Sequence, residues 1–230
     1  MKVLLFGATG MVGQGVLIEC LRDDRVESVT AIGRGKSGRQ HPKLREIAHK
    51  NLFDFSSLEN ELAGIDACFF CLGIASAGMK EEDYRRITKD IAVAAADTLA
   101  KLNPNLVFVF VSGTGTDSTE KGRIMWARVK GEAENALLRM PFKATYVFRP
   151  AIIQPMYGVK SRTRLYRVFY VLTAPIFPLV KVLFPKKVTT TERIGQAMIN
   201  AVVRGYPKKI LESPDINELA STPPGRQEAG

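Results

Sequence analysis

The stretch that decides the fold is Gly7-Ala8-Thr9-Gly10-Met11-Val12-Gly13, which directly follows the apolar run Val3-Leu4-Leu5-Phe6. The run predicts a buried strand, and the residues after the first glycines predict a helix with one apolar side. Glycines at this spacing let the chain reverse, let backbone approach a pyrophosphate and let the helix pack close to the sheet. The amides and dipole at the helix start favour phosphate there. We predict a dinucleotide-binding turn; the alternative is a tight glycine turn in an unrelated α/β protein.

Outward from this turn, short apolar runs alternate with helical periodicity. The predicted strands are Val3–Phe6, Ser28–Ile32, Arg45–His49, Ala67–Leu72, Leu106–Val111 and Ala144–Phe148. The predicted helices are Met11–Arg22, Glu81–Ala100, Ile124–Arg139 and Thr189–Arg204, the last with Thr189 and Glu192 as a capping box. Continuous apolar strands alternating with helices indicate a parallel sheet covered on both faces. We therefore predict an α/β fold with a doubly wound parallel sheet and a small C-terminal substrate lobe.

Composition is typical of a soluble globular protein, with 46% hydrophobic and 24% charged residues in 230. It excludes a wholly disordered chain, a collagen-like chain and a small disulfide scaffold. We expect one domain over residues 1–220, with 154–187 as a substrate-lobe or docking insertion and 221–230 as a flexible tail. The apolar run at the N-terminus ends too soon for a secretory signal, so we expect a cytoplasmic protein.

The three cysteines and two histidines leave little for a metal site, and none is predicted. Cys68-Phe69-Phe70-Cys71 has the spacing of a redox or zinc motif. It lies in a predicted buried strand, where alternation points the two thiols to opposite faces. We therefore interpret both cysteines as core residues.

The formal net charge of +10 is confined to one window. Residues 135–191 contain ten basic and no acidic side chains, and the rest of the chain is neutral. Inside the window, 168–180 carries no charge and is flanked by lysines and arginines. Two interpretations stay open: a substrate lobe that encloses an apolar substrate, or contact of 160–187 with acidic membrane lipid or a protein partner. Nucleic acid is not expected, because no binding motif accompanies the charge.

The end of the second predicted strand indicates which cofactor is preferred. NAD-selective sites place a carboxylate there to bind the ribose 2′-hydroxyl. This chain has Ile32-Gly33-Arg34 instead, with Lys36 and Arg39 nearby and no acid. A guanidinium can bind a 2′-phosphate through two hydrogen bonds and stack on adenine. We predict NADP(H) over NAD(H); the alternative is that Arg34 is a solvated loop cation.

Over most of residues 2–205 the chain resembles the atypical branch of the short-chain dehydrogenase/reductase superfamily, Rossmann proteins similar to NAD-dependent epimerases and dehydratases. Within it the chain is most similar to the Tat-interacting oxidoreductase-like group. The resemblance implies an adenine contact at Asp54, a ribose contact at Cys71-Leu72-Gly73, an active-site serine at Ser112, an active-site lysine at Lys130 and a nicotinamide contact in Phe148–Ile153. Loop and resemblance together predict cofactor contacts at Gly7, Thr9, Gly10, Met11, Val12, Gly13, Arg34, Asp54, Phe55, Cys71, Leu72, Gly73, Ser112, Lys130, Pro150, Ala151 and Ile152.

One departure from the family affects the chemistry. The family places a catalytic tyrosine four residues before the lysine, and this chain has Trp126 there. An indole donates a hydrogen bond but cannot serve as an acid or base near neutral pH. Three outcomes stay open: cofactor binding without turnover, a proton from another group such as Tyr157 or Tyr84, or a reaction that needs no strong acid.

The resulting functional hypothesis is an NADP(H)-dependent oxidoreductase or epimerase with Ser112 and Lys130 as catalytic residues. Its substrate would be a small apolar molecule with a carbonyl or secondary alcohol. The alternative is a catalytically silent NADP(H)-binding regulatory or membrane-associated scaffold, for which Trp126 would be no handicap.

Overall fold

Seven parallel strands form the central sheet in a computed structural model, which describes residues 1–159, 184 and 186–221. They are β1 (Lys2–Phe6), β2 (Ser28–Gly33), β3 (Leu44–Ala48), β4 (Ala67–Phe70), β5 (Val107–Val111), β6 (Ala144–Arg149) and β9 (Ile210–Glu212). Their order across the sheet is β3-β2-β1-β4-β5-β6-β9. The order reverses beside β1, which is the point where doubly wound sheets bind dinucleotides. The predicted fold class is confirmed.

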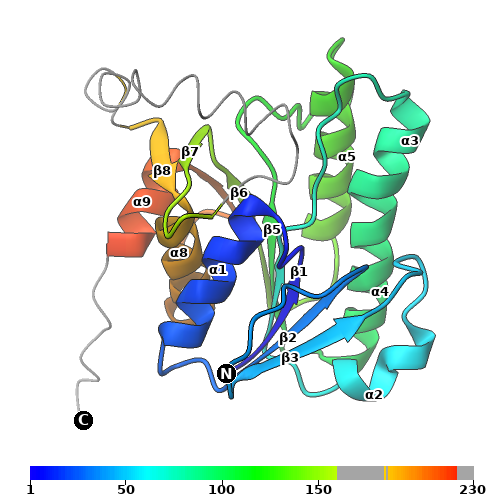
Figure 1. The fold of residues 1–230 in the computed structure, drawn as a ribbon. Coiled ribbons are helices and arrows are strands. Elements are labelled where there is room, and N and C mark those ends of the chain that lie inside the picture. The colour runs from blue at the N-terminus through cyan, green and yellow to red at the C-terminus, as the bar shows by residue number, and fades with distance from the viewer. Residues whose placement is uncertain (160–183, 185, 222–230) are drawn as a thin grey trace.

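Helices cover both faces of this sheet (Figure 1). One face carries α1 (Met11–Arg22), α8 (Thr191–Arg204) and α9 (Ser213–Ser221). The other carries α2 (Glu59–Leu62), α4 (Ile91–Leu102) and α5 (Met125–Leu138). A 3₁₀ turn at Ser56–Leu58 precedes α2, and α3 (Glu81–Arg85) continues through a π-helical turn at Arg86–Asp90 into α4. The helix predicted over 81–100 is therefore continuous but contains a wide turn.

Strand β4 shows how the two halves of the core are separated. Cys68 and Phe70 pack under α2, α4 and α5, whereas Phe69 and Cys71 pack on the side of α1 and α8. Successive strand residues point to opposite faces, so the two cysteines cannot meet. Both are free thiols. The prediction that they are core residues is confirmed.

The described C-terminal residues complete this main fold. β9 pairs with β6, and α8 packs against α1. A second, two-stranded parallel sheet joins β7 (Ile152–Gln154) to β8 (Val188–Thr190). Residues 160–183 and 185 of the predicted insertion, and all but the first residue of the predicted tail, lie outside the described residues.

The predicted start of the last long helix is wrong by two residues. Thr189 is in β8, and the capping residue is Thr190, whose hydroxyl accepts a hydrogen bond from the Arg193 amide at 3.0 Å. Glu192 is therefore not the reciprocal partner of a capping box. The pairing of β8 with β7 holds Thr189 in extended backbone and moves the cap one residue on.

Candidate cofactor and catalytic site

The glycine turn joins the carboxyl end of β1 to the start of α1. Gly7 has a positive φ of 81°, and a Cβ there would lie 2.7 Å from the backbone of Cys71. A Cβ on Gly13 would lie 2.1 Å from the Gly7 carbonyl oxygen. Real side chains cannot occupy either space. These two glycines therefore set the tight turn and the close approach of helix to strand.

The start of α1 fits a pyrophosphate. Gly10 is the residue before the helix and supplies no side chain to cap it, and the first turn has no acidic residue. The Thr9 carbonyl accepts a hydrogen bond from Gln14 Nε2 at 3.0 Å, which holds the loop against the helix. The first-turn amides, with those of Met11 and Val12 among them, thus have no carboxylate competing with a bound phosphate.

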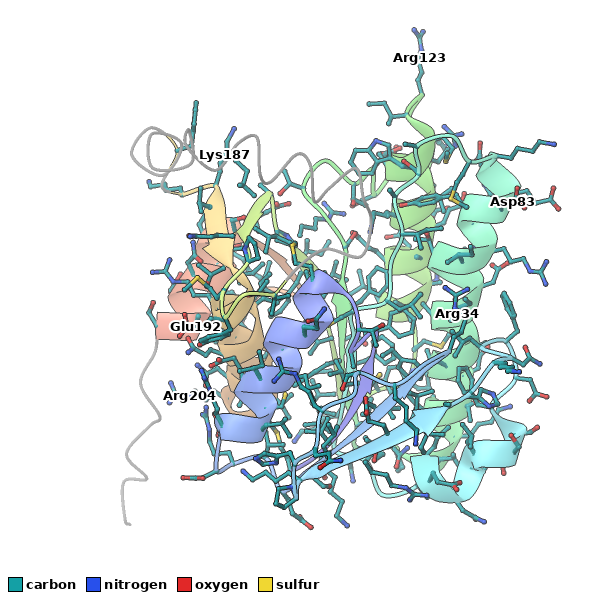
Figure 2. All side chains as sticks on the ribbon, in the orientation of Figure 1. Arg34, Asp83, Arg123, Lys187, Glu192 and Arg204 are labelled. Atoms are coloured by element: carbon teal, nitrogen blue, oxygen red, sulfur yellow. The ribbon has the colours of Figure 1, made fainter. Side chains whose placement is uncertain are left out.

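The predicted adenosine end of the site lies beyond β2. Arg34 is the first residue after that strand, is exposed, and belongs to no ion pair within the described chain (Figure 2). Asp54 is exposed as well, and its Oδ1 accepts the Ser56 amide at 2.9 Å. That backbone bond lowers the pKa of the Asp54 carboxyl. Phe55 is buried and packs edge-on against Phe6, so only its backbone can face a cofactor.

The segment after β4 passes directly behind the glycine turn. Cys71 lies with its backbone against Gly7, and its amide donates to the Phe6 carbonyl at 3.0 Å. Its thiol is directed into the core, where burial raises the thiol pKa. Leu72 packs on the opposite face, and Gly73 is exposed with open space around it. Cys71 therefore acts through its backbone, and Gly73 leaves room for a ribose.

Ser112 directly follows β5 and lies in a network of hydroxyl groups. Its Oγ is 3.1 Å from Thr116 Oγ1, which in turn donates to the Gly113 carbonyl at 2.8 Å. Because the threonine proton is used in that second bond, the serine hydroxyl is the donor in the first. Sequence reasoning missed Thr116. The signal for it was the run Ser-Gly-Thr-Gly-Thr after an apolar strand.

The segment after β6 lies beside this loop. The Ser112 amide donates to the Phe148 carbonyl at 2.8 Å, and the Thr114 amide donates to the Pro150 carbonyl at 3.2 Å. The Ala151 amide is bonded to Ser213 Oγ, and the Ile152 amide to the Lys187 carbonyl. The structure thus brings together two sequence-predicted segments that are almost forty residues apart.

The loop then returns to α5 and packs against it. The Asp117 amide donates to the Ala127 carbonyl at 3.0 Å. A Cβ on Gly115 would lie 3.4 Å from the Trp126 ring, and one on Gly131 would lie 1.8 Å from the Asp117 carbonyl oxygen. The loop that carries Ser112 therefore contacts α5 both before Lys130, at Trp126 and Ala127, and directly after it, at Gly131. Arg123, just before α5, points away from the molecule (Figure 2).

Lys130 is half-buried on α5, with its Nζ 5.9 Å from the centre of the Phe110 ring. Burial lowers the pKa of its amine to about 8, and the Glu134 charge one helical turn away opposes that shift. Glu134 is fully buried and is itself ion-paired with Arg149 at the end of β6. Neither partner of that ion pair was singled out from the sequence.

The two tyrosines proposed as substitute acids lie in different surroundings. Tyr157 has a positive φ of 57°, and its hydroxyl donates to Glu19 Oε1 on α1 at 2.9 Å. Desolvation and that carboxylate raise the pKa of the phenol, and the Arg22 guanidinium covers the ring. Tyr84 is buried in α3, only 2% exposed. Among the described residues, the Tyr157 hydroxyl bonds Glu19 and forms no bond to Ser112 or Lys130.

The doubly wound sheet and its glycine turn define the class, a protein with the Rossmann fold seen in NAD-binding epimerases and short-chain dehydrogenases/reductases. The fold is similar to that of the Bordetella bronchiseptica enzyme WbmF, solved in complex with NAD+. The TM-score is 0.68, with 15% identity, covering 95% of this chain and 76% of that one. No family model matches the chain.

Curated relatives place the chain more narrowly. It is 31% identical over 172 residues to protein fmp52-1, mitochondrial, of Aspergillus terreus, covering 71% of this chain and 70% of that protein. It is 28% identical over 155 residues to protein HTATIP2 of Rattus norvegicus, covering 66% of this chain. The chain belongs to the family of HTATIP2 and FMP52 proteins, which are NAD(P)-binding atypical short-chain dehydrogenases/reductases. It spans 62% of the length of rat HTATIP2.

The predicted location in the cell stays a prediction. The fungal relative has "mitochondrial" in its name, which differs from the cytoplasmic location expected from the sequence. In the part of the chain that the structure describes, every helix is too short or too polar to cross a bilayer. The predicted membrane or protein contact through 160–187 lies mostly outside the described residues.

Proposed function

We propose that the protein is an NADP(H)-dependent oxidoreductase or epimerase that acts on a carbonyl or secondary alcohol of a small apolar substrate. One observation carries the proposal. The loop with Ser112 packs against α5 on both sides of Lys130, at the same edge of the sheet as the glycine turn. Ligands of open α/β sheets bind at this edge, outside the carboxyl ends of the strands.

Each group in the site has a role that its surroundings support. The first-turn amides of α1 would hold the pyrophosphate, and the exposed Gly73 would let backbone approach the ribose. Lys130 would hold the second ribose, and Ser112 would redirect its hydroxyl proton from Thr116 to the substrate oxygen. When bound, the nicotinamide supplies or accepts a hydride. The apolar substrate is inferred from the uncharged stretch 168–180, which lies outside the described residues.

The preference for NADP(H) rests on Arg34. Its guanidinium follows β2 directly, is exposed, and pairs with no carboxylate among the described residues. A guanidinium free of a partner can bind a 2′-phosphate without first breaking an ion pair. By contrast, Asp54 is held by Ser56 and lies after β3, so it does not replace the missing acid after β2.

A calorimetric titration with NADPH and NADH tests the cofactor part. Arg34→Ala should weaken NADPH binding by about 10- to 100-fold, which is the loss in affinity expected when one or two charge-assisted hydrogen bonds are removed. NADH binding should change little. Arg39→Ala is the matched control, an exposed arginine on the same connection. Equal losses for both cofactors would refute the phosphate preference, and no binding by the wild type would refute the proposed function.

A second candidate function is cofactor binding without turnover, and Trp126 is the observation that favours it. The ring lies against the loop that carries Ser112, where the family keeps its proton donor. Trp126→Tyr separates the two candidates in an assay of NADPH oxidation with apolar aldehydes and ketones. A rise in rate supports an enzyme. Normal cofactor binding with no rate in either protein supports the silent function.

A further inference from the structure

We infer that Lys130 itself exchanges the proton with the substrate oxygen in this protein, in place of a tyrosine. The inference rests on the proposed function and assigns one step of it to one atom, Lys130 Nζ. It rests on the hydrogen-bond partners, the ion pairs and the burial of the polar groups in the site.

Trp126, Ser112 and Tyr157 do not provide the acid. Trp126 has no proton to release near neutral pH. Ser112 is a weak acid whose proton is directed to Thr116. Tyr157 donates to Glu19 on α1, and burial together with that carboxylate disfavours loss of the phenol proton.

The carboxylates near α5 are already engaged. Asp117 accepts the Thr119 hydroxyl at 2.7 Å and the Gly122 amide at 2.6 Å, and these bonds from its own loop lower the pKa of its carboxyl. Glu132 is ion-paired with Arg85 and Lys89. Glu134 is fully buried against Arg149. Each of the three is held by groups of the protein itself.

Lys130 is different in position and in partners. Its Nζ lies over the ring of Phe110, and Ser112 follows Phe110 by two residues in the sequence. Side chains two apart along an extended strand share a face, so the amine and the serine hydroxyl are on the α5 side of the sheet. Within the described residues no carboxylate forms an ion pair with Lys130. The charge that acts on it is that of Glu134 on its own helix, and Glu134 is itself ion-paired with Arg149 on β6.

These surroundings suit an acid–base group. An amine that has lost solvent and has no counterion releases its proton more readily, and burial brings the pKa of Lys130 to about 8. General acids work best when their pKa is close to the working pH. A lysine held by a carboxylate would not meet this condition.

In reduction, an N–H bond of the Lys130 ammonium breaks while an O–H bond forms on the former carbonyl oxygen. The hydride that completes the new C–H bond comes from the reduced nicotinamide, which is oxidised. Lys130 is left as a neutral amine and recovers a proton from water. In oxidation the neutral amine accepts the alcohol proton. The rate of reduction should therefore fall as pH rises through about 8, and the rate of oxidation should rise.

The first test needs neither cofactor nor substrate. The full chain is labelled with trace acetic anhydride at a series of pH values, with a free amine as internal standard, and acetylation of each lysine is measured by peptide mass spectrometry. Lys130 should reach half of its limiting reactivity near pH 8. Half-reactivity at the pH typical of solvated lysines, about 10.4, would overturn the inference.

The second test separates proton transfer from cofactor holding. Lys130→Arg keeps the positive charge and the hydrogen-bond donors, but a guanidinium does not release its proton. NADPH affinity by calorimetry should stay within a few-fold. Reduction of apolar aldehydes should fall by about 10²-fold or more, the usual worth of a general acid. The same change in the Trp126→Tyr background should cost at least tenfold less, because a tyrosine then supplies the proton. Equal losses in both backgrounds would make Lys130 a positioning residue and overturn the inference.

Failure of the proposed function and failure of the inference give different results. Absence of NADPH binding by the wild type removes the proposed function itself. NADPH binding without turnover in the wild type overturns the inference and leaves the silent candidate. Tyr84→Phe and Tyr157→Phe should keep the alkaline fall in the reduction rate. Loss of that fall in either variant would assign the proton to that tyrosine.

Discussion

Replacing Arg149 by methionine should destabilise the protein severely, because it leaves a buried carboxylate without its partner. Arg149 Nε lies 3.1 Å from each carboxylate oxygen of Glu134. The Glu134 side chain is 0% exposed and that of Arg149 is 11% exposed. Removing one partner of a buried pair costs about 3–5 kcal/mol. The folding equilibrium should therefore shift toward the unfolded state by about two to four orders of magnitude, at roughly 1.4 kcal/mol for each factor of ten.

Urea unfolding measures this loss. Trp126 is the only tryptophan in the chain, so its fluorescence reports on α5, the helix that carries Glu134. Circular dichroism follows the rest of the fold. Lys208→Met is the control, because Lys208 also bonds a carboxylate, on Asp215 at 2.6 Å, but its side chain is 63% exposed. An exposed pair is worth about 0–1 kcal/mol.

A double variant completes the test. With Glu134→Gln added to Arg149→Met, no charge is left buried, so most of the lost stability should return. The reasoning is refuted if Arg149→Met costs no more than Lys208→Met. It is also refuted if the double variant is as unstable as the single one, since the damage would then come from lost packing.

Three further predictions concern other parts of the structure. Gly13→Ala should lower stability by about 1–3 kcal/mol, as overpacking does, whereas Gly35→Ala, which meets open space, should be nearly neutral in thermal unfolding. Tyr157→Phe should cost about 1 kcal/mol by removing the hydrogen bond to Glu19, and an unchanged urea midpoint would count against that contact. Burial raises the pKa of the thiols of Cys20, Cys68 and Cys71. A disulfide reagent should therefore modify them slowly in the native protein, faster as pH rises and fastest after unfolding. Rapid reaction of the native protein would contradict their burial.

Most of the sheet could be predicted from local patterns. Strands of a parallel sheet are buried on both faces, so they are almost continuously apolar, as in Ala67–Phe70. Helix α1 has the predicted bounds because the glycine turn marks its start. The seventh strand and its helix were not predicted. Ile210–Glu212 is only three residues long, and a strand that short has no period to detect.

The candidate site, too, could be predicted only in part from local sequence patterns. The glycine turn is a local pattern, whereas Ser112 and Lys130 were assigned from the family resemblance, and the structure puts these residues at one edge of the sheet. The cap at Thr190 shows the limit of such patterns. Its position depends on where β8 ends, and that is set by pairing with β7, more than thirty residues earlier.

The sequence by itself determined the first six strands of the sheet, the four long helices, the glycine turn and the absence of a tyrosine at position 126, because each depends on neighbouring residues alone. Only the tertiary structure decided which polar groups are free and which are engaged. Tyr157 is bonded to a glutamate 138 residues away, and Glu134 to an arginine on another element. Such pairs form when distant segments pack together, so no local pattern encodes them, and they leave Lys130 without a carboxylate partner among the described residues.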